Sequence, residues 1–377
     1  MLGFRAQIVT LIGTVGYFAY SADAQSQPVV KAYEYGTYQE LADKLIHDNA
    51  APGMVLSVYQ SGKAETVVSG VRRAGTDDKV TRGDLWLTAS IGKPMTSTLI
   101  AMLIDEGRLD WGTTLKEALP GISMRPDYEQ VTVRDLLQHR GRVQPYTDLG
   151  SSPQLSAKTP TEMREEFVSK LLQEEPLERP QYSNGGYGAL ALIAEKATGM
   201  EFKALMQEYV FDRLGMTTAR IAPTGSTGQF GSKGQPFMHR RSDNGFVPVE
   251  IDSPMTMYHA LQGAGAGIAM SIEDFVKFGR FHLDGMQGRA RLISQETFDE
   301  IHRAPEGKSY ANGWGIHRLG NLEWQAHNGG NGMMHAELHV IPSLDMVIAS
   351  VANAGRTKPG DDAPYRAVMS IVEKEKD

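Results

Sequence analysis

The chain has 377 residues, 41% of them hydrophobic, so it can bury a sizeable core in one large domain or two interleaved lobes. Its 38 basic and 45 acidic residues leave a formal charge of −7 and form no long runs, which argues against nucleic-acid binding because such surfaces cluster Lys and Arg. The chain contains no cysteine, which excludes disulfides, thiolate nucleophiles and Cys-ligated zinc sites.

Residues 1–24 have the features of a secretory signal peptide. Arg5 lies near the start, an apolar run covers residues 8–19, and Ala22-Asp23-Ala24 is a small-x-small cleavage site. The apolar run is about a dozen residues, shorter than the roughly 20 that a membrane-spanning helix needs. We therefore expect an exported bacterial protein, periplasmic or secreted, whose mature chain covers residues 25–377 without an integral membrane segment. The alternative is an N-terminal anchor that is not cleaved.

A helix followed by a β-hairpin is predicted next. Apolar residues at helical spacing cover residues 39–49, and Ala51-Pro52-Gly53 ends that pattern. Two β-rich runs at residues 54–60 and 64–70 are separated by Ser61-Gly62-Lys63, which is typical of a hairpin turn.

The middle of the chain is predicted to be mostly helical. Thr132, Thr159 and Ser271 are each followed by an acidic residue three positions later, the pattern of a helix start. Further helices are predicted over residues 186–198 and 201–214, each ended by a glycine. The likeliest flexible loop covers residues 225–234.

The last third returns to strands, predicted at residues 313–318, 322–327, 335–341 and 346–352, and ends in a helix over residues 364–374. Strands at both ends around a helical middle predict an α+β fold. The terminal strands would form one antiparallel sheet flanked by helices, and the middle a helical second lobe. The expected sheet lobe covers about 25–83 and 300–377, and the helical lobe about 84–299.

Ser90 and Lys93 form the sharpest chemical signal. They lie where a strand-like segment, residues 84–88, gives way to a helix that ends at Gly107. Ser and Lys three apart on a helix share one face, so the amine can accept the proton of the hydroxyl. This role requires an environment that favours the neutral amine, because the reference pKa of lysine is about 10.4.

Penicillin-recognising enzymes combine Ser-x-x-Lys with two further sequence elements. Tyr182-Ser183-Asn184 matches the Tyr-x-Asn form of the second element, in which a phenol can relay a proton and an amide can hold a carbonyl. A second Tyr-x-Asn starts at Tyr310. Tyr182 is preferred because it lies between the nucleophile and the last strands and opens a helix.

The third element is a strand with a polar residue and a glycine that lets the backbone approach the substrate. His327-Asn328-Gly329-Gly330 fits, because it ends the strand predicted over residues 322–327. A histidine here takes the place of the usual lysine.

With these motifs in this order, the chain resembles the serine β-lactamase-related family over about residues 38–372. That family includes class C β-lactamases, D-Ala-D-Ala carboxypeptidases, esterases and D-aminopeptidases. The segment ending in His139, Leu136-Leu137-Gln138-His139, and the Gly-rich residues 265–271 support the resemblance. The fold that it implies is the β-lactamase/transpeptidase type.

The resemblance also implies roles for individual residues. Ser90 would be the nucleophile, Lys93 and Tyr182 the proton-handling pair, and Asn184 a contact of substrate and lysine. The wall of the substrate site would be formed by His327 and Gly329, and the oxyanion hole by the backbone N–H groups of Ser90 and Gly330. No cofactor or metal is implied.

Two departures from the family pattern bear on the substrate. Arg140-Gly141-Arg142 follows His139 where Thr-Ser-Gly is usual. His327 replaces a lysine whose charge would bind the carboxylate of β-lactams and peptide C-termini, whereas histidine is largely neutral near pH 7.

We therefore expect a serine hydrolase that cleaves a peptide, ester or β-lactam through an acyl-Ser90 intermediate, with a preference for ester or D-Ala-type peptide substrates. The alternatives are a true class C-like β-lactamase and a penicillin-binding sensor that does not turn over. A zinc hydrolase using His327, His335 and His339 is a weaker alternative, because residues 335–341 alternate like a strand. The Gly-x-Ser-x-Gly of classical Ser-His-Asp hydrolases is absent.

Overall fold

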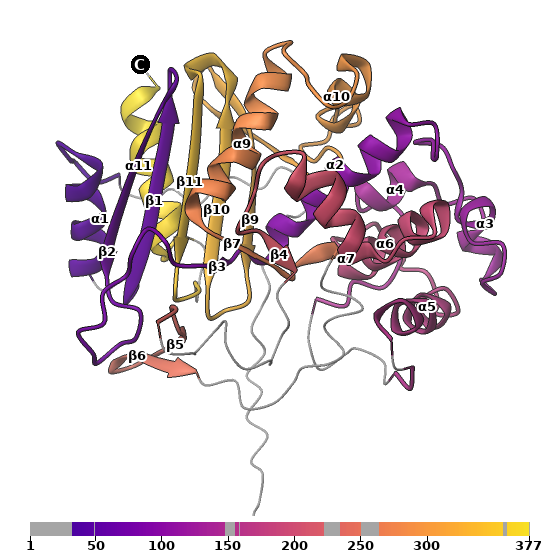
Figure 1. Ribbon diagram of the computed structural model, residues 1–377, viewed down its shortest axis with the longest axis horizontal. Helices are drawn as coiled ribbons and strands as arrows, with labels where there is room; N and C mark the ends of the chain where they lie inside the picture. The colour runs from indigo at the N-terminus through magenta and orange to yellow at the C-terminus, as the bar shows by residue number, and fades with distance from the viewer. Residues whose placement is uncertain are drawn as a thin grey trace, which may run out of the picture.

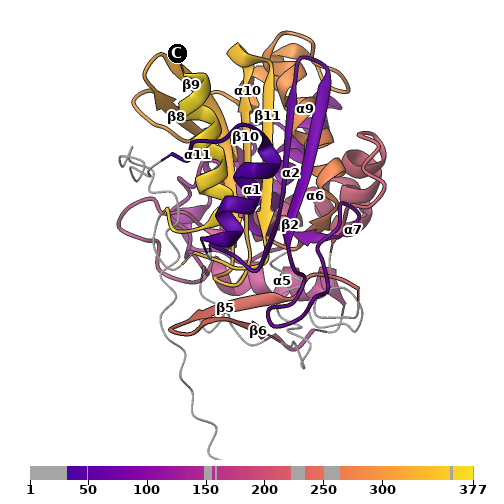
Figure 2. The ribbon, with the colours of Figure 1, turned by 90° about the vertical axis from the view of Figure 1, so that its left-hand side faces the viewer.

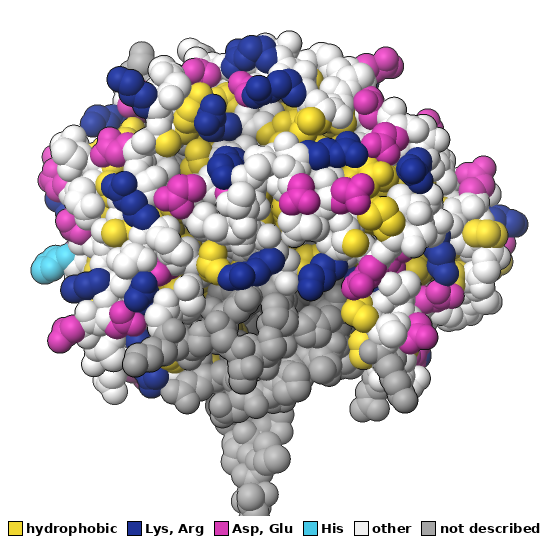
Figure 3. Space-filling model, in the orientation of Figure 1, with side chains coloured by type: hydrophobic (Ala, Val, Ile, Leu, Met, Phe, Trp, Pro, Cys, Tyr) yellow, Lys and Arg dark blue, Asp and Glu magenta, His cyan; other side chains and the backbone are white. Residues whose placement is uncertain are grey.

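A computed structural model describes residues 32–48, 50–147, 155–157, 159–221, 234–249, 264–356 and 360–376. The predicted signal peptide lies outside the described residues, as does all of the predicted 225–234 loop except Gly234. No helix within the described ranges is long and apolar enough to cross a membrane. Basic and acidic side chains are interspersed over the face in Figure 3, as their even spacing along the sequence predicts.

A six-stranded antiparallel sheet joins the two ends of the chain, as predicted (Figure 1). Its order is β2-β1-β11-β10-β9-β8, and the strands alternate in direction throughout. The strands are β1 (Gly53–Gln60), β2 (Lys63–Gly70), β8 (Gly315–Leu319), β9 (Leu322–Gly330), β10 (His335–Ile341) and β11 (Met346–Ala352). The 3₁₀ turn η5 (Pro342–Leu344) connects the last two.

Helices cover both faces of this sheet. Helices α1 (Tyr38–His47) and α11 (Ala363–Glu375) lie together on one face, as Figure 2 shows, and enclose a core of their own with β1 and β11. Helix α9 (Ile272–Met286) packs on the other face, although its residues fall within the range predicted for the helical lobe. Helix α10 (Gln295–Ile301) follows and contacts α9 and α2. The sheet is therefore the middle layer of three.

Beside the sheet lies the predicted group of helices, centred on α2 (Gly92–Asp105) (Figure 1). Every α2 residue from 92 to 103 is buried, because neighbouring elements surround the helix. Two helices of this group begin at predicted caps, because Thr132 and Thr159 each accept a backbone N–H with their side chains. The helix predicted from residue 186 begins two residues earlier, at the N-cap Ser183. The other helices of the group are α3 (Leu115–Ala118), η2 (Pro126–Tyr128), α4 (Val133–Leu137), α5 (Pro160–Leu171) and α6 (Asn184–Thr198). Helix α6 packs on α2, and α3, α4 and α5 pack on α6.

The structure differs from the sequence-based expectation in details. The helix expected over residues 201–214 begins as α7 (Phe202–Leu205) and continues as a π-helical segment, η4 (Met206–Asp212). Short strands form two small sheets, and only the first of these strands falls within a segment predicted to be strand-like, residues 84–88. One is β3 (Trp86–Leu87), β7 (Ile268–Met270) and β4 (Arg220–Ile221), and the other is the hairpin of β5 (Met238–Ser242) and β6 (Gly245–Val249). Strands of two or three residues are too short to show an alternating pattern.

Candidate active site

Ser90 lies at the junction between the small β3 sheet and helix α2. The backbone N–H and hydroxyl of Thr88 both donate to the carbonyl oxygen of Ile268, at 3.0 Å each, which fixes the residue at the end of β3. The next residue, Ala89, has φ 45°, a left-handed conformation that costs energy in a residue with a Cβ. The chain then forms the 3₁₀ turn η1 (Ala89–Ile91) and enters α2. This sharp turn leaves Ser90 partly exposed at the helix start.

Lys93 is fully buried one turn behind Ser90, and its amine has three polar neighbours. Nζ lies 3.2 Å from Ser90 Oγ, 2.7 Å from Asn184 Oδ1 and 3.0 Å from the carbonyl oxygen of Gly265. The amide orientation of Asn184 is consistent with this contact, because its Nδ2 donates to the carbonyl of Tyr146 at 3.1 Å. Three segments distant in sequence therefore converge on one nitrogen.

These contacts suit a neutral amine. The oxygens of Asn184 and Gly265 can only accept, so they take two N–H groups of Lys93. The remaining direction, toward Ser90 Oγ, is then available to the nitrogen lone pair. Burial lowers the pKa of Lys93 well below its usual value, which favours the neutral form. Lys93 can thus accept the hydroxyl proton of Ser90, as its position in the sequence suggests.

Tyr182 lies beside this pair. Lys93 Nζ is 4.5 Å from the centroid of the Tyr182 ring, and the ring of His139 packs against that of Tyr182 with 4.3 Å between the centroids. His139 Nδ1 accepts the backbone N–H of Ser183 at 3.0 Å, so it supports the turn that carries Tyr182 and Asn184. Burial lowers the pKa of His139 well below its usual value, which keeps Nδ1 an acceptor.

The end of strand β9 forms a wall against Ser90. A Cβ on Gly329 would stand 2.0 Å from the carbonyl oxygen of Thr88 and 2.7 Å from the backbone nitrogen of Ser90, so this contact requires glycine. A Cβ on Gly330 would stand 2.9 Å from Nδ1 of His335, on the opposite face of the sheet. Gly329, one of the predicted wall residues, is therefore next to the nucleophile.

His327 is fully buried on the same strand, and its ring contacts the protein rather than solvent. Its Nδ1 lies 2.6 Å from the carbonyl oxygen of Asn328, so Nδ1 carries the proton, and Nε2 accepts from the hydroxyl of Tyr310 at 3.1 Å. Burial lowers the pKa of His327 to about 3. The imidazole is therefore neutral at physiological pH, as the sequence predicts.

Tyr310, the tyrosine of the second Tyr-x-Asn, is also close to the site. Its ring lies 5.0 Å from that of His139, which therefore contacts both Tyr182 and Tyr310. Asn312, in contrast, is buried away from Lys93 and donates to the carbonyl of Glu300 at 2.7 Å. The first Tyr-x-Asn therefore supplies the lysine contact, whereas the second contributes only its tyrosine.

The zinc site considered as an alternative does not form. His327 pairs with Leu338, and side chains alternate along a strand, so its ring faces the opposite side of the sheet from His335 and His339. Glu337 separates those two, with Oε1 2.8 Å from Nε2 of His335 and Oε2 2.9 Å from Nε2 of His339. The three histidines cannot share one ion.

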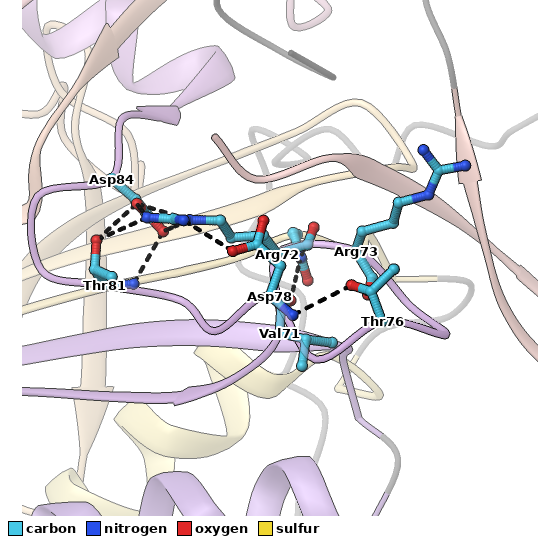
Figure 4. A network of polar contacts seen from close by, with 8 residues as sticks. Val71, Arg72, Arg73, Thr76, Asp78, Thr81 and Asp84 are labelled. Atoms are coloured by element: carbon cyan, nitrogen blue, oxygen red, sulfur yellow. Dashed lines mark hydrogen bonds and ion pairs between the residues drawn. The ribbon is translucent and has the colours of Figure 1, made fainter. Parts of the chain in front are cut away.

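A polar network that the sequence did not reveal fixes the segment leading into β3 (Figure 4). Arg72 binds the buried carboxylate of Asp84 through Nη2 at 2.6 Å and Nε at 3.0 Å. Thr81 donates its backbone N–H and its hydroxyl to the same carboxylate, at 3.0 and 2.8 Å. Asp78, more exposed, binds Nη1 of Arg72 at 3.0 Å. The start of the Ser90 turn is thereby attached to the end of the β1–β2 hairpin.

Comparisons with known proteins agree with this architecture. Penicillin-binding protein 4 of Amycolatopsis lactamdurans is 24% identical, with 86% of each chain covered. The unguisins hydrolase ungD' of Aspergillus campestris is 23% identical over 86% of this chain and 62% of its own length.

Solved structures show the same fold. The D-amino acid amidase from Ochrobactrum anthropi SV3 has a TM-score of 0.71 at 20% identity, covering 90% of this chain and 98% of the amidase. The class C β-lactamase from Rhodobacter sphaeroides has a TM-score of 0.66 at 19% identity, covering 89% and 97%. These neighbours confirm the predicted fold class. The family model described as Beta-lactamase matches residues 39–373, so the chain belongs to the β-lactamase family of serine hydrolases.

Proposed function

We propose that this protein hydrolyses esters and amides that lack a free carboxylate, especially those of D-amino acids and D-peptides, through an acyl intermediate on Ser90. The observation that carries the proposal is the buried amine of Lys93, 3.2 Å from Ser90 Oγ and held by two other acceptors. A neutral lysine so placed is a general base for a serine nucleophile.

The geometry supports a two-step reaction. As Ser90 Oγ bonds to the substrate carbonyl carbon, its proton moves to Lys93 Nζ. The carbonyl oxygen becomes an oxyanion, which the backbone N–H groups of Ser90 and Gly330 would stabilise. Collapse breaks the bond to the alcohol or amine, which leaves with a proton from Lys93 or, through its hydroxyl, Tyr182. Water then attacks the acyl group, gives up a proton to the same pair, and releases the acid and free Ser90.

The neutral state of His327 supports the preference for substrates that lack a free carboxylate. With its pKa lowered to about 3 by burial, His327 offers no fixed positive charge to a substrate carboxylate. The solved neighbours include D-amino acid amidases and a D-stereospecific amidohydrolase, and one curated relative is called an unguisins hydrolase. Their names fit an amide substrate without a β-lactam ring.

Covalent binding of penicillin is the second candidate function, because one relative is called penicillin-binding protein 4 and others β-lactamase. In this case Ser90 would be acylated by the β-lactam, either with turnover, as in a class C-like β-lactamase, or without it, as in a sensor.

Intact-mass spectrometry distinguishes these functions. The protein is incubated in turn with a p-nitrophenyl ester, D- and L-phenylalanine amide and benzylpenicillin, and adducts and products are followed over time. We expect turnover of the ester and the D-amide, and slow or no acylation by penicillin. Ser90→Ala should abolish all adducts, whereas Ser97→Ala, which changes another buried-helix serine of α2, should keep them. Adducts that persist in Ser90→Ala would refute the assignment of the nucleophile, and faster turnover of penicillin would favour the β-lactamase.

A further inference from the structure

Behind the wall strand, on the face of the sheet that α11 covers, lies a group of buried histidine and carboxylate side chains. His335 and Glu337 are on β10, and Asp362 is the N-cap of α11. All three are at most 2% exposed. One possible ligand atom from each lies within 4.8 Å of the others. We propose that His335, Glu337 and Asp362 bind a divalent transition-metal ion, Zn²⁺ or Mn²⁺, that links strand β10 to the start of helix α11.

The distances suit one ion after a small movement. Nε2 of His335 lies 2.8 Å from Glu337 Oε1 and 3.6 Å from Asp362 Oδ1. Ligands of zinc lie about 2.0–2.2 Å from the ion, so two of them can be at most about 4.4 Å apart. The two measured separations are already within this limit. A small rotation of the Asp362 side chain would bring the third pair within it.

Asp362 supplies an independent sign that a ligand is missing. Its Oδ1 accepts the backbone N–H of Tyr365 at 2.9 Å, as expected of an N-cap. Its Oδ2 is buried and has no hydrogen-bond partner among the described residues. Buried carboxylate oxygens almost always have a partner, because desolvation without one is costly. A bound cation would provide that partner.

Hydrogen bonds from Trp324 to His339, and between His339 and Glu337, orient one of these ligands, as neighbouring side chains usually do at metal sites. Trp324 donates its indole N–H to Nδ1 of His339 at 2.8 Å, so the proton of neutral His339 is on Nε2. That Nε2 lies 2.9 Å from Glu337 Oε2, which fixes the orientation of the carboxylate. Histidines and carboxylates behind the ligands commonly orient them in this way.

The charges also favour a divalent ion. Glu337 and Asp362 place two carboxylates in the interior, and the Nδ1 of His339 is already bound to the indole N–H of Trp324. The partly buried Arg356 is a cation whose charge acts on Asp362. One imidazole and two carboxylates, without thiolates, suit Zn²⁺ or Mn²⁺ better than Mg²⁺, which prefers oxygen ligands and retains water. Binding moves the proton from Nε2 of His335 to its Nδ1 or to solvent.

Metal binding to the full chain tests the proposal. Because the ligands are buried, the protein is unfolded with a chelator, refolded, and dialysed against Zn²⁺, Mn²⁺ or Mg²⁺ before its metal content is measured. We expect one Zn²⁺ or Mn²⁺ per chain, little Mg²⁺, and a melting temperature that rises with metal concentration. Asp362→Asn keeps a good N-cap and should weaken binding at least about tenfold.

Asp274→Asn is the matched control, since Asp274 is another buried acid that accepts a backbone N–H, from Thr218 at 2.6 Å, on α9. It should bind metal like the unsubstituted protein. If Asp362→Asn does not fold, Glu337→Gln, which has nearly the same size, replaces it. Absence of bound metal, or equal binding by the unsubstituted protein and a folded ligand variant, would overturn the proposal.

Discussion

Adding one methyl group at Gly329 tests how closely β9 must approach the nucleophile. In Gly329→Ala the new Cβ would stand 2.0 Å from the carbonyl oxygen of Thr88 and 2.7 Å from the backbone nitrogen of Ser90. Ordinary non-bonded contacts are about 3.5–4.0 Å, so the strand and the Ser90 turn must separate by more than about 1 Å. The separation would pull apart the two N–H groups, of Ser90 and Gly330, that we propose for the oxyanion hole.

The expected loss follows from that displacement. Loss of one oxyanion donor costs about 10²–10³-fold in kcat, or about 2.7–4 kcal/mol, and a 1 Å misplacement alone can cost about 100-fold. We therefore expect kcat/KM for a p-nitrophenyl ester to fall at least about 100-fold. Overpacking should cost about 1–3 kcal/mol of stability, so the variant should remain folded.

Gly83→Ala is the control for this substitution, because its Cβ would meet nothing within 4 Å. It should keep kcat/KM within about twofold of the unsubstituted protein. Both variants are compared by steady-state kinetics and thermal melting. If folded Gly329→Ala keeps more than about a third of the activity, the close approach of β9 does not position the reacting groups, and the reasoning fails.

Three further predictions concern the tyrosines, the Arg72 network and pH. Tyr182→Phe should slow acylation about 10²–10⁴-fold in stopped-flow measurements. Tyr310→Phe should mainly lower stability, by about 1–3 kcal/mol, because it removes the hydrogen bond from the Tyr310 hydroxyl to Nε2 of His327. The reverse outcome would mean that Tyr310 handles the proton. Asp84→Ala removes the buried partner of Arg72 and leaves it only the exposed Asp78 and the hydroxyl of Thr81. It should lower the free energy of unfolding in urea by about 1–3 kcal/mol, against less than about 1 for the exposed Asp78→Ala; equal effects would contradict the importance of burial. Burial lowers the pKa of His327 to about 3, so below about pH 6.5 the unfolded chain binds more protons than the folded one. Stability should therefore decrease as the pH falls, and this histidine alone should contribute a loss of about 2 kcal/mol at pH 5. A urea midpoint that stays constant between pH 7 and pH 5 would contradict this prediction.

Much of the fold could be predicted because its elements carry strong local signals. The β1–β2 hairpin has a polar turn between two β-rich runs, and α5 starts at Thr159 with a capping box, which the structure contains. The strand-like residues 84–88 contain β3, but its partners β4 and β7 could not be predicted, because their pairing depends on contacts between segments that are far apart. They nonetheless hold Thr88, and so the turn that presents Ser90.

The candidate site was predictable where sequence spacing fixes geometry. Ser90 and Lys93 are close because one helical turn separates them, and the contact of Lys93 with Asn184 follows the order of the motifs. The carbonyl of Gly265 had no signal beyond a Gly-rich segment, because any residue has a carbonyl. The ring of His139 and the bond between Tyr310 and His327 also depend on tertiary packing, and no local pattern reports them.

The replacement of lysine by histidine on the wall strand is linked to Tyr310. A buried neutral imidazole whose Nδ1–H binds the carbonyl of Asn328 leaves Nε2 as an acceptor, and a buried acceptor requires a donor. The hydroxyl of Tyr310 is that donor, at 3.1 Å. The charged Nζ of a lysine in place of His327 has no lone pair, so it could not accept a hydrogen bond from the Tyr310 hydroxyl. It would instead donate to the oxygen of that hydroxyl. His327 and Tyr310 therefore act as a pair. Changing His327 to lysine should improve recognition of anionic substrates only if the new ammonium group also finds protein acceptors for its N–H groups, which the neutral His327 does not require. The second Tyr-x-Asn, which looked like a competitor of the first, supplies the group that makes an uncharged wall possible.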